Sequence, residues 1–141
     1  MNEMLSILLV DDDEVDVQNI QRSFRKLGII NPLRVAMDGL VALEILQTLR
    51  DKAEELPGLI LLDLNMPRMN GLEFLERLRH DPDLRCLCVV VLTTSAEEKD
   101  VVEAYQYNVA GYVVKPVTME AFFEAMSTIN KYWKLCERPC P

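Results

Sequence analysis

The chain has 141 residues, of which 50% are hydrophobic and 27% are charged, a size and composition typical of one globular domain and not of a disordered or fibrous protein. Its formal net charge of −8 would repel nucleic-acid phosphates and anionic membrane surfaces, and it favours cations or basic protein patches as partners. We therefore expect one domain over residues 1–135 that binds neither nucleic acid nor membrane. The Pro-broken stretch 136–141 is expected to be a short disordered tail.

In chain order, the hydrophobic pattern predicts a strand over 5–10, a helix over 14–27, a weaker strand over 33–37, a helix over 40–50, a strand over 59–62, a helix over 71–79, a strand over 88–92, a helix over 96–107, a strand over 111–114 and a helix over 119–133. The four main apolar runs lack polar alternation, which predicts strands buried on both faces. Residues 54–58, Glu-Glu-Leu-Pro-Gly, predict a surface loop.

This strict alternation of strand and helix predicts an α/β fold: a single (βα)5 unit with a doubly wound, parallel five-stranded sheet and helices on both faces. The position of the weaker strand 33–37 within the sheet stays open. In such sheets, ligands bind outside the carboxyl ends of the strands. The residues that follow each strand are therefore the ones to search for a site.

Polar side chains follow four of the predicted strands directly. They are Asp11, Asp12 and Asp13 after the first, Asp63 and Asn65 after the third, Thr93 after the fourth and Lys115 after the fifth. Carboxylates brought close together repel one another, and their oxygens suit a hard cation such as Mg²⁺. With a hydroxyl and an ammonium beside them, they provide a nucleophile and donors for phosphoryl oxygens. The pattern predicts Mg²⁺-dependent transfer of a phosphoryl group from a phosphohistidine to Asp63.

Over about residues 4–130, the chain resembles the receiver domain of two-component response regulators, which has a flavodoxin-like fold. The resemblance rests on Val10-Asp11-Asp12, on the loop from Leu62-Asp63 to Asn70-Gly71, on Leu92-Thr93 and on Val114-Lys115-Pro116, four motifs in order and in register.

The resemblance implies a role for each site residue. Asp63 would be the phosphoacceptor, with Thr93 and Lys115 as its catalytic partners. Mg²⁺ would be held by Asp11, Asp12, Asp63 and the main-chain carbonyl of Asn65. Thr93 would move toward the phosphoryl group and Tyr112 would turn inward, which reshapes the face of the last two helices. Pro116 would follow a cis peptide bond.

The 54–58 loop and the aromatic last helix also resemble stand-alone receivers that partner phytochrome-type histidine kinases. This implies a sensor histidine kinase as phosphodonor. Because no effector sequence follows Trp133, we expect a signalling switch that acts by protein contact. Beyond self-phosphorylation and slow autodephosphorylation, it would not be an enzyme.

Other functions compete with this interpretation. A phosphorelay shuttle, which passes its phosphoryl group to a histidine phosphotransfer protein, is equally compatible with the sequence. A haloacid-dehalogenase-type phosphatase needs an acid two residues after its nucleophile, where this chain has Asn65. A flavin-binding protein is disfavoured because the acidic triplet 11–13 would repel the cofactor's phosphate.

Several residues have simpler structural interpretations. Asp13 is expected to cap the first helix, and His80 to complete a helix end. Met119, Phe122, Met126, Ile129 and Trp133 form one helical stripe, which predicts a core face. Phe123 and Tyr132 lie outside it and could contribute to an interface, such as a homodimer through the last two helices.

The cellular compartment is predicted from two further patterns. The N-terminus lacks a basic region, and the apolar run 5–10 is too short for a signal peptide or membrane span, so we expect a cytoplasmic protein. The four cysteines lack the spacing of zinc knuckles and are expected to be thiols in a reducing compartment: Cys86, Cys88, Cys136 and Cys140.

Overall fold

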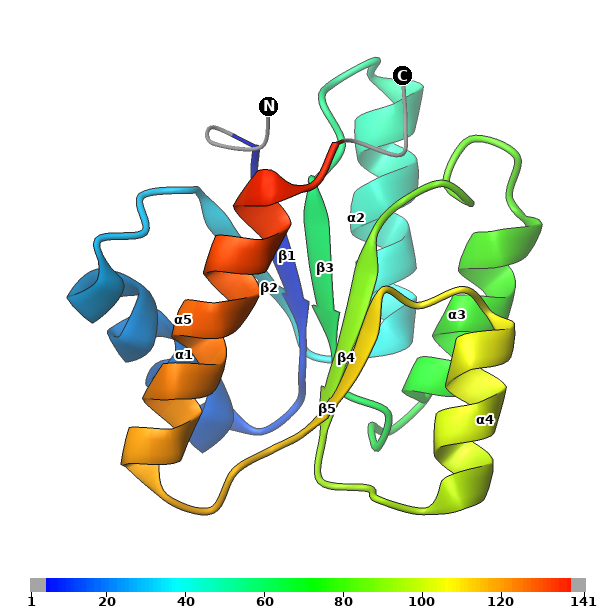
Figure 1. The fold of residues 1–141 in the computed structure, drawn as a ribbon. Helices are drawn as coiled ribbons and strands as arrows, with labels where there is room; N and C mark the ends of the chain where they lie inside the picture. Colours follow the sequence, from blue (N-terminus) through cyan, green and yellow to red (C-terminus); the bar gives the residue numbers. More distant parts are fainter. Residues whose placement is uncertain (1–4, 138–141) are drawn as a thin grey trace.

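One sheet of five parallel strands, in the order β2-β1-β3-β4-β5, runs through the computed structural model, which describes residues 5–137 (Figure 1). The strands are β1 (Ile7–Val10), β2 (Leu33–Ala36), β3 (Leu59–Leu62), β4 (Val89–Thr93) and β5 (Gly111–Val114). The helices are α1 (Glu14–Leu27), α2 (Gly39–Asp51), α3 (Gly71–His80), α4 (Glu98–Gln106) and α5 (Met119–Leu135). The predicted fold class is confirmed, and the weaker strand is β2 at one edge of the sheet.

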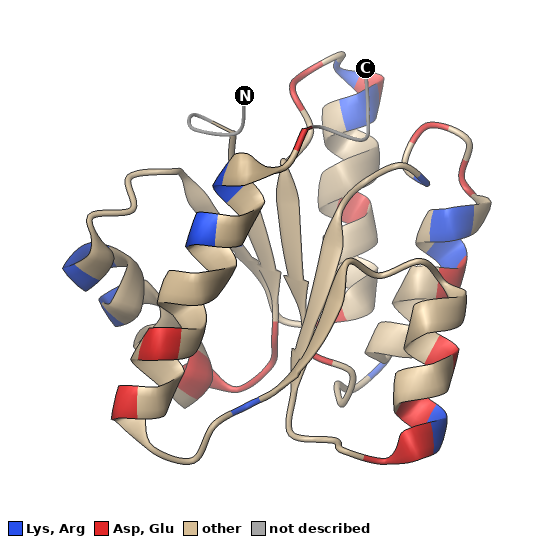
Figure 2. Ribbon diagram, in the orientation of Figure 1, with Lys and Arg blue, Asp and Glu red and all other residues tan. Residues whose placement is uncertain are grey.

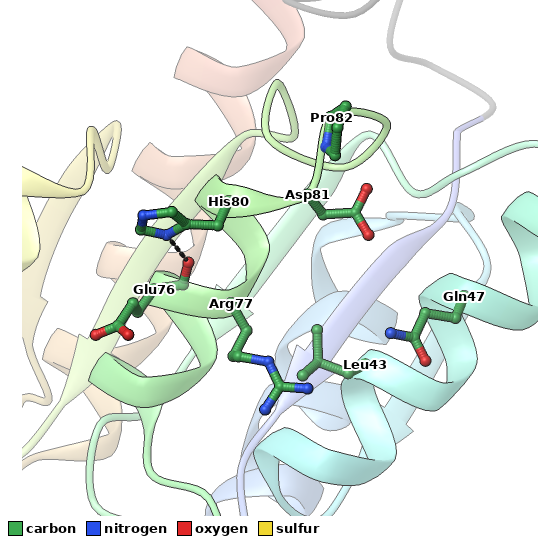
Figure 3. Close-up of a pocket in the computed structure, with 7 residues that line it drawn as sticks. All are labelled: Leu43, Gln47, Glu76, Arg77, His80, Asp81 and Pro82. Atoms are coloured by element: carbon green, nitrogen blue, oxygen red, sulfur yellow. Dashed lines mark hydrogen bonds between the residues drawn. The ribbon is translucent and has the colours of Figure 1, made fainter.

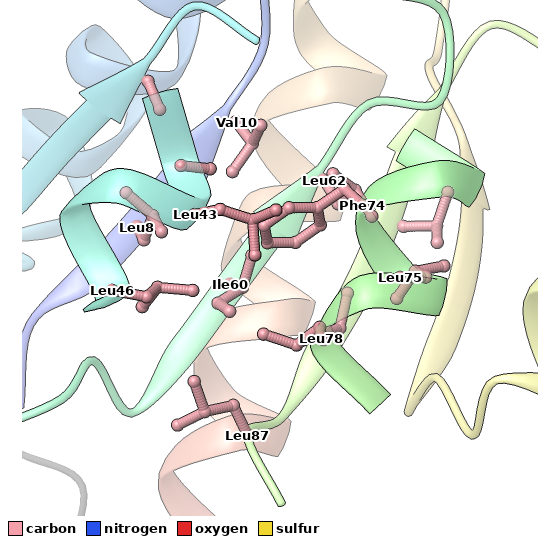
Figure 4. Close-up of a cluster of buried hydrophobic side chains, with 14 of the residues drawn as sticks. Leu8, Val10, Leu43, Leu46, Ile60, Leu62, Phe74, Leu75, Leu78 and Leu87 are labelled. Atoms are coloured by element: carbon pink, nitrogen blue, oxygen red, sulfur yellow. The ribbon is translucent and has the colours of Figure 1, made fainter. Parts of the chain in front are cut away.

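The helices form two layers that enclose the sheet. In Figure 1, α1 and α5 cover one face and α2, α3 and α4 cover the other. Each strand sends alternate side chains to the two faces: Leu8 and Val10 join the cluster under α2 and α3, whereas Ile7 and Leu9 join the one under α1 and α5. Figure 4 shows the first cluster around Phe74, a fully buried aromatic of α3. Covering both faces explains why β1 and β3 are apolar throughout and why β4 is apolar up to its last residue, Thr93.

The expectation that every main strand is buried on both faces is wrong for β5. Its four residues are half-buried or exposed, and Val114 is 44% exposed. The reason is topological: β5 pairs only with β4 and forms the edge of the sheet opposite β2. An apolar composition does not distinguish an edge strand from a central one.

Side-chain caps fix where the helices begin, and therefore where the polar loops lie. Asp13 accepts hydrogen bonds from the backbone N–H groups of Val15 and Asp16, as predicted. Asn70 and Glu73 form a reciprocal capping box at the start of α3. Gly28 ends α1 in the left-handed conformation, with φ 68°.

The last helix packs with a shorter apolar stripe than expected. Phe122, Met126 and Trp133 are buried, but Met119, the first residue of α5, is 46% exposed. The indole Nε1–H of Trp133 donates to the carbonyl of Gly58, 3.2 Å away. This bond ties the end of α5 to the predicted loop before β3.

The prediction that all four cysteines are thiols is wrong. Cys86 is disulfide-bonded, whereas Cys88 and Cys136 carry thiols; Cys140 lies outside the described residues, as does the rest of the tail from 138 onward. Sequence spacing cannot reveal which sulfur atoms a fold brings to bonding distance. Among residues 5–137, no helix combines the length and apolar character needed to cross a membrane.

Arg79 joins three segments on the α3 side of the sheet. Its guanidinium donates to the carbonyls of Tyr107, Arg85, Leu87 and Asn108 at 2.6–3.2 Å. Burial lowers its pKa from the ordinary value.

We expect Arg79→Ala to lower the free energy of unfolding by about 3 kcal/mol, because it leaves several carbonyls without a charged donor. Urea denaturation measures this; Arg77→Ala, an exposed change on the same helix, should cost less than about 0.5 kcal/mol. Equal losses of unfolding free energy in the two variants would contradict the stabilising role of the Arg79 hydrogen bonds.

Candidate functional site

Parallel pairing brings the polar strand ends to one edge of the sheet. Val10 is in register with Leu62, and Thr93 with Val114. Asp11, Asp63 and Lys115 follow these strands directly, so they must lie together. In Figure 2, acidic residues gather at this lower end of the molecule, and most basic ones lie at the opposite end.

Three carboxylates converge there. Asp11, Asp12 and Asp63 each offer an oxygen, and these oxygens lie within 4.8 Å of one another. Asp11 and Asp63 are 1% and 6% exposed, and Asp12 is the most open of the three. Hard oxygen donors clustered at an open edge fit a divalent cation such as Mg²⁺, which keeps several of its waters. The three predicted carboxylate ligands are therefore brought together, whereas the contribution of the Asn65 carbonyl stays a prediction.

One ammonium, that of Lys115, offsets part of the negative charge in this pocket. Lys115 Nζ lies 2.9 Å from Asp11 Oδ2, 3.4 Å from Asp63 Oδ2 and 2.7 Å from Asp16 Oδ2. Burial alone would lower the pKa of Lys115, but its hydrogen bonds to Asp16 and Asp11 outweigh burial and hold the pKa above the ordinary value. Lys115 is therefore a fixed positive charge inside the site.

Lys115 reaches this position through a trans peptide. The expected cis bond before Pro116 is wrong, since no peptide bond among residues 5–137 is cis. The N–H of Lys115 donates to the carbonyl of Thr93 at 2.7 Å and continues the β4–β5 pairing. Extended backbone before a proline is compatible with the trans form, which costs less than cis.

Burial strongly affects the carboxyl group of Asp11. Desolvation raises its pKa to about 6, against the lowering effect of the hydrogen bond from Lys115. Its other oxygen, Oδ1, accepts the N–H of Asp13 at 2.9 Å. In the metal-free protein, Asp11 therefore exchanges a proton close to neutral pH.

This pKa predicts a pH dependence of metal binding. A proton on Asp11 must leave before the carboxylate can face Mg²⁺, so the affinity should be constant above about pH 7 and fall as the pH drops through 6, by up to about tenfold per unit. Isothermal titration calorimetry from pH 5 to 8 measures this. An affinity that stays constant down to pH 5 would contradict the raised pKa.

A buried hydroxyl contacts the third carboxylate. Thr93, fully buried at the end of β4, donates its hydroxyl to Asp63 Oδ1 at 2.8 Å. The backbone N–H of Asn65 also donates to Oδ1, at 3.3 Å. Asp63 is thereby held between Thr93 on one oxygen and Lys115 on the other. Asp63, Thr93 and Lys115, the three residues predicted to act together, are therefore neighbours in the structure.

Two contacts anchor the loop that carries Asp63. Gly71 packs so closely that a Cβ there would lie 2.5 Å from the Asp63 carbonyl and 2.7 Å from Leu64 Cα. On the other side, Arg68, with a left-handed φ of 63°, binds Asp38 at 2.7 Å and so joins the β2–α2 loop to this one. The loop is therefore held both where α3 begins, at Gly71, and within its span, at Arg68.

The predicted switch aromatic lies beside the site. Tyr112 on β5 donates its hydroxyl to the carbonyl of Ser95 at 2.8 Å. Ser95 in turn donates to Asp100 Oδ2 at 2.6 Å, which links the β4–α4 loop to α4. Tyr112 is thus tied to the segment that directly follows Thr93, and its movement stays a prediction.

The shallow groove between α2 and α3 is remote from this chemistry. Figure 3 shows the groove, about 510 Å³ in volume, with His80 and Glu76 from α3 and Gln47 from α2. His80 Nδ1 lies 2.7 Å from the Glu76 carbonyl, one turn earlier. His80 therefore completes the end of α3, as expected.

Asp16 is the site residue that the sequence interpretation missed. Asp16 is not among the residues predicted for the site, yet it forms the shortest of the three contacts of Lys115. The missed signal is its position: an acid in the first helical turn after an acidic strand end lies at the same edge as the site.

Comparison with known proteins identifies the family. Residues 7–127 match the model of the response regulator receiver domain. The chain belongs to the response regulator receiver family. Receivers are signalling switches in two-component systems and not enzymes, which excludes the phosphatase and flavin-binding interpretations.

Individual receivers are also similar to this one. Response regulator Rcp1 of Synechocystis sp. is 37% identical over 128 residues, which cover 90% of this chain and 87% of that protein. The structure of the phosphorylated cyanobacterial phytochrome response regulator RcpA superposes with a TM-score of 0.85 at 32% identity, covering 93% of this chain and 94% of RcpA. The Mn²⁺-bound form of Rcp1 gives a TM-score of 0.83 at 36% identity, covering 92% and 94%. The receiver is therefore related to phytochrome response regulators.

Proposed function

We propose that this receiver accepts a phosphoryl group on Asp63 from a phosphohistidine of a sensor histidine kinase and thereby changes a protein-binding face. One observation carries the proposal: the buried Asp63 carboxylate lies between the Thr93 hydroxyl and the Lys115 ammonium, beside two further carboxylates. A nucleophile, a fixed cation and a hydroxyl donor at one point are what transfer of a phosphoryl group requires.

The chain's own residues would act mainly by position. An Asp63 oxygen attacks phosphorus, the P–N bond to the donor imidazole breaks, and the imidazole leaves with the bonding electrons. Lys115 is already within 3.4 Å of Asp63 and can donate to a phosphoryl oxygen. Thr93 then exchanges its bond to Asp63 for one to the phosphoryl group. The product is an aspartyl phosphate.

Asp11, Asp12 and Asp63 would hold the metal ion, together with the Asn65 carbonyl. When bound, Mg²⁺ supplies positive charge against the transferring oxygens and offsets the repulsion among the carboxylates. The choice of a divalent cation is supported by the oxygen donor set and by the Mn²⁺-bound form of the similar protein Rcp1.

The switching face would be formed by α4, β5 and α5. Among the described residues, most exposed large apolar side chains lie on these elements or between them: Val102, Tyr105, Val114, Val117, Met119, Tyr132 and Leu135. The bond from Tyr112 to the Ser95 carbonyl connects this face to the segment after Thr93. A movement of Thr93 would therefore change the conformation of this face through the β4–α4 loop. A downstream protein, or a second copy of the chain, is the partner expected there.

The phosphodonor is expected to be a phytochrome-type histidine kinase, because the similar proteins RcpA and Rcp1 include a phytochrome response regulator.

Acetyl phosphate, a small phosphodonor, allows the chemistry to be tested without the kinase. Intact-mass spectrometry of the wild type and of Asp63→Asn, with and without Mg²⁺, is the test. We expect one phosphoryl adduct, only with Mg²⁺ and only in the wild type. An equal adduct on Asp63→Asn would contradict the proposal.

A further inference from the structure

We propose that Asp16 is a positioning residue that competes with Asp11 and Asp63 for the ammonium of Lys115 and so limits how closely this charge approaches Asp63. This inference rests on the proposed function and assigns a role to a residue outside the predicted site. Its basis is the order of the three contacts of Lys115: 2.7 Å to Asp16, 2.9 Å to Asp11 and 3.4 Å to Asp63. The acceptor carboxylate is the most distant of the three.

An ammonium has three donors and behaves as a compact point charge on a flexible stem. In this structure, Lys115 directs donors to three different carboxylates, with its side chain only 6% exposed. A phosphoryl group on Asp63 would add anionic oxygens that need one of these donors. Asp16 competes for the same charge, and it is 22% exposed, so water can solvate it when the lysine leaves. Of the three contacts of Lys115, the one with Asp16 therefore has the smallest free-energy cost of breaking.

The start of α1 fixes Asp16 in this role. Asp13 Oδ1 accepts the backbone N–H groups of Val15 and Asp16, at 2.9 and 3.4 Å, so the first turn has a defined orientation. Glu14 lies in the same turn and carries the same charge, but its side chain is exposed and no contact joins it to Lys115. A general effect of acids at a helix N-terminus would be shared by both residues. Contact with Lys115 distinguishes them.

Removing the carboxylate of Asp16 should have two effects of opposite sign. Without Asp16, Lys115 shifts its charge toward Asp11 and Asp63, where it competes with a metal ion, so Mg²⁺ binds more weakly. The same shift gives a phosphoryl group on Asp63 a closer cation, so a phosphoryl mimic binds more tightly once Mg²⁺ is saturating. A merely structural role for Asp16 would weaken both.

The experiment measures the Kd for Mg²⁺, and the Kd for beryllofluoride at saturating Mg²⁺, by isothermal titration calorimetry on the full chain. In Asp16→Asn we expect the Kd for Mg²⁺ to rise about 3- to 10-fold and that for beryllofluoride to fall by a similar factor. Asp16→Glu should stay near the wild type, and Glu14→Gln should change neither value by more than about twofold.

Changes of the same sign in Asp16→Asn, or changes equal to those of Glu14→Gln, would overturn the inference. If wild-type protein binds Mg²⁺ but no beryllofluoride, the proposed function fails instead. In that case the Mg²⁺ titrations still decide the position of Lys115: an unchanged Kd in Asp16→Asn overturns the inference, and a raised Kd there supports it only if Asp16→Glu and Glu14→Gln both stay near the wild type.

Discussion

Replacing Lys115 with methionine is expected to lower the free energy of unfolding of the metal-free protein by about 3 kcal/mol, and Mg²⁺ should restore most of the loss. Lys115 is the cation shared by Asp11, Asp16 and Asp63. Removing one partner of a buried ion pair leaves uncompensated charge, which is costly even where the pair itself contributes little. A bound divalent cation stabilises the folded state by mass action and replaces the missing charge.

Urea denaturation in EDTA and in excess Mg²⁺ measures both parts of this prediction. Lys131→Met is the matched control, because it removes an exposed charge from α5. Its stability should stay within about 0.5 kcal/mol of the wild type in either buffer. A Lys115→Met protein as stable as the wild type in EDTA would show that the carboxylates do not need this cation.

Replacing Gly71 with alanine is expected to impair phosphoryl uptake as well as folding. The added Cβ would lie 2.5 Å from the Asp63 carbonyl and 2.7 Å from Leu64 Cα, both backbone atoms that cannot rotate away. The loop must shift, at a cost of about 2–3 kcal/mol in stability. Because a displacement of about 1 Å can slow a reaction by about 100-fold, labelling by acetyl phosphate should slow by a similar factor.

Gly111→Ala is the control for this change, since a Cβ at Gly111 meets nothing within 4 Å. Its melting temperature and labelling rate should match those of the wild type. If Gly71→Ala is labelled as fast as Gly111→Ala, the close packing of α3 against the acceptor loop does not position Asp63.

The layout of the fold could be predicted because hydrophobic pattern and chain order constrain it strongly. Continuous apolar runs at Leu59–Leu62 and at 89–92 require cover on both faces, and alternating helices provide it. The edge position of β5 could not be predicted, because exposure there depends on a missing neighbour strand and not on composition. The disulfide of Cys86 was likewise hidden, since bonding depends on distances in space.

The site was predictable to the extent that strand ends determine it. Asp11, Asp63, Thr93 and Lys115 directly follow or end strands, and parallel pairing brings them together. Asp16 was missed because its contact with Lys115 depends on how the first turn of α1 is oriented. Side-chain caps set that orientation, and they resemble ordinary helix starts in the sequence.

The central claim, that Asp63 carries the phosphoryl group, is tested most directly by mapping the modified residue. Borohydride reduces an acyl phosphate to an alcohol, so an aspartyl phosphate becomes homoserine, which peptide mass spectrometry locates. After incubation with acetyl phosphate and Mg²⁺, we expect homoserine at position 63, and none when Mg²⁺ is omitted. Homoserine at position 11 or 12 instead, or labelling that does not require Mg²⁺, would contradict the account.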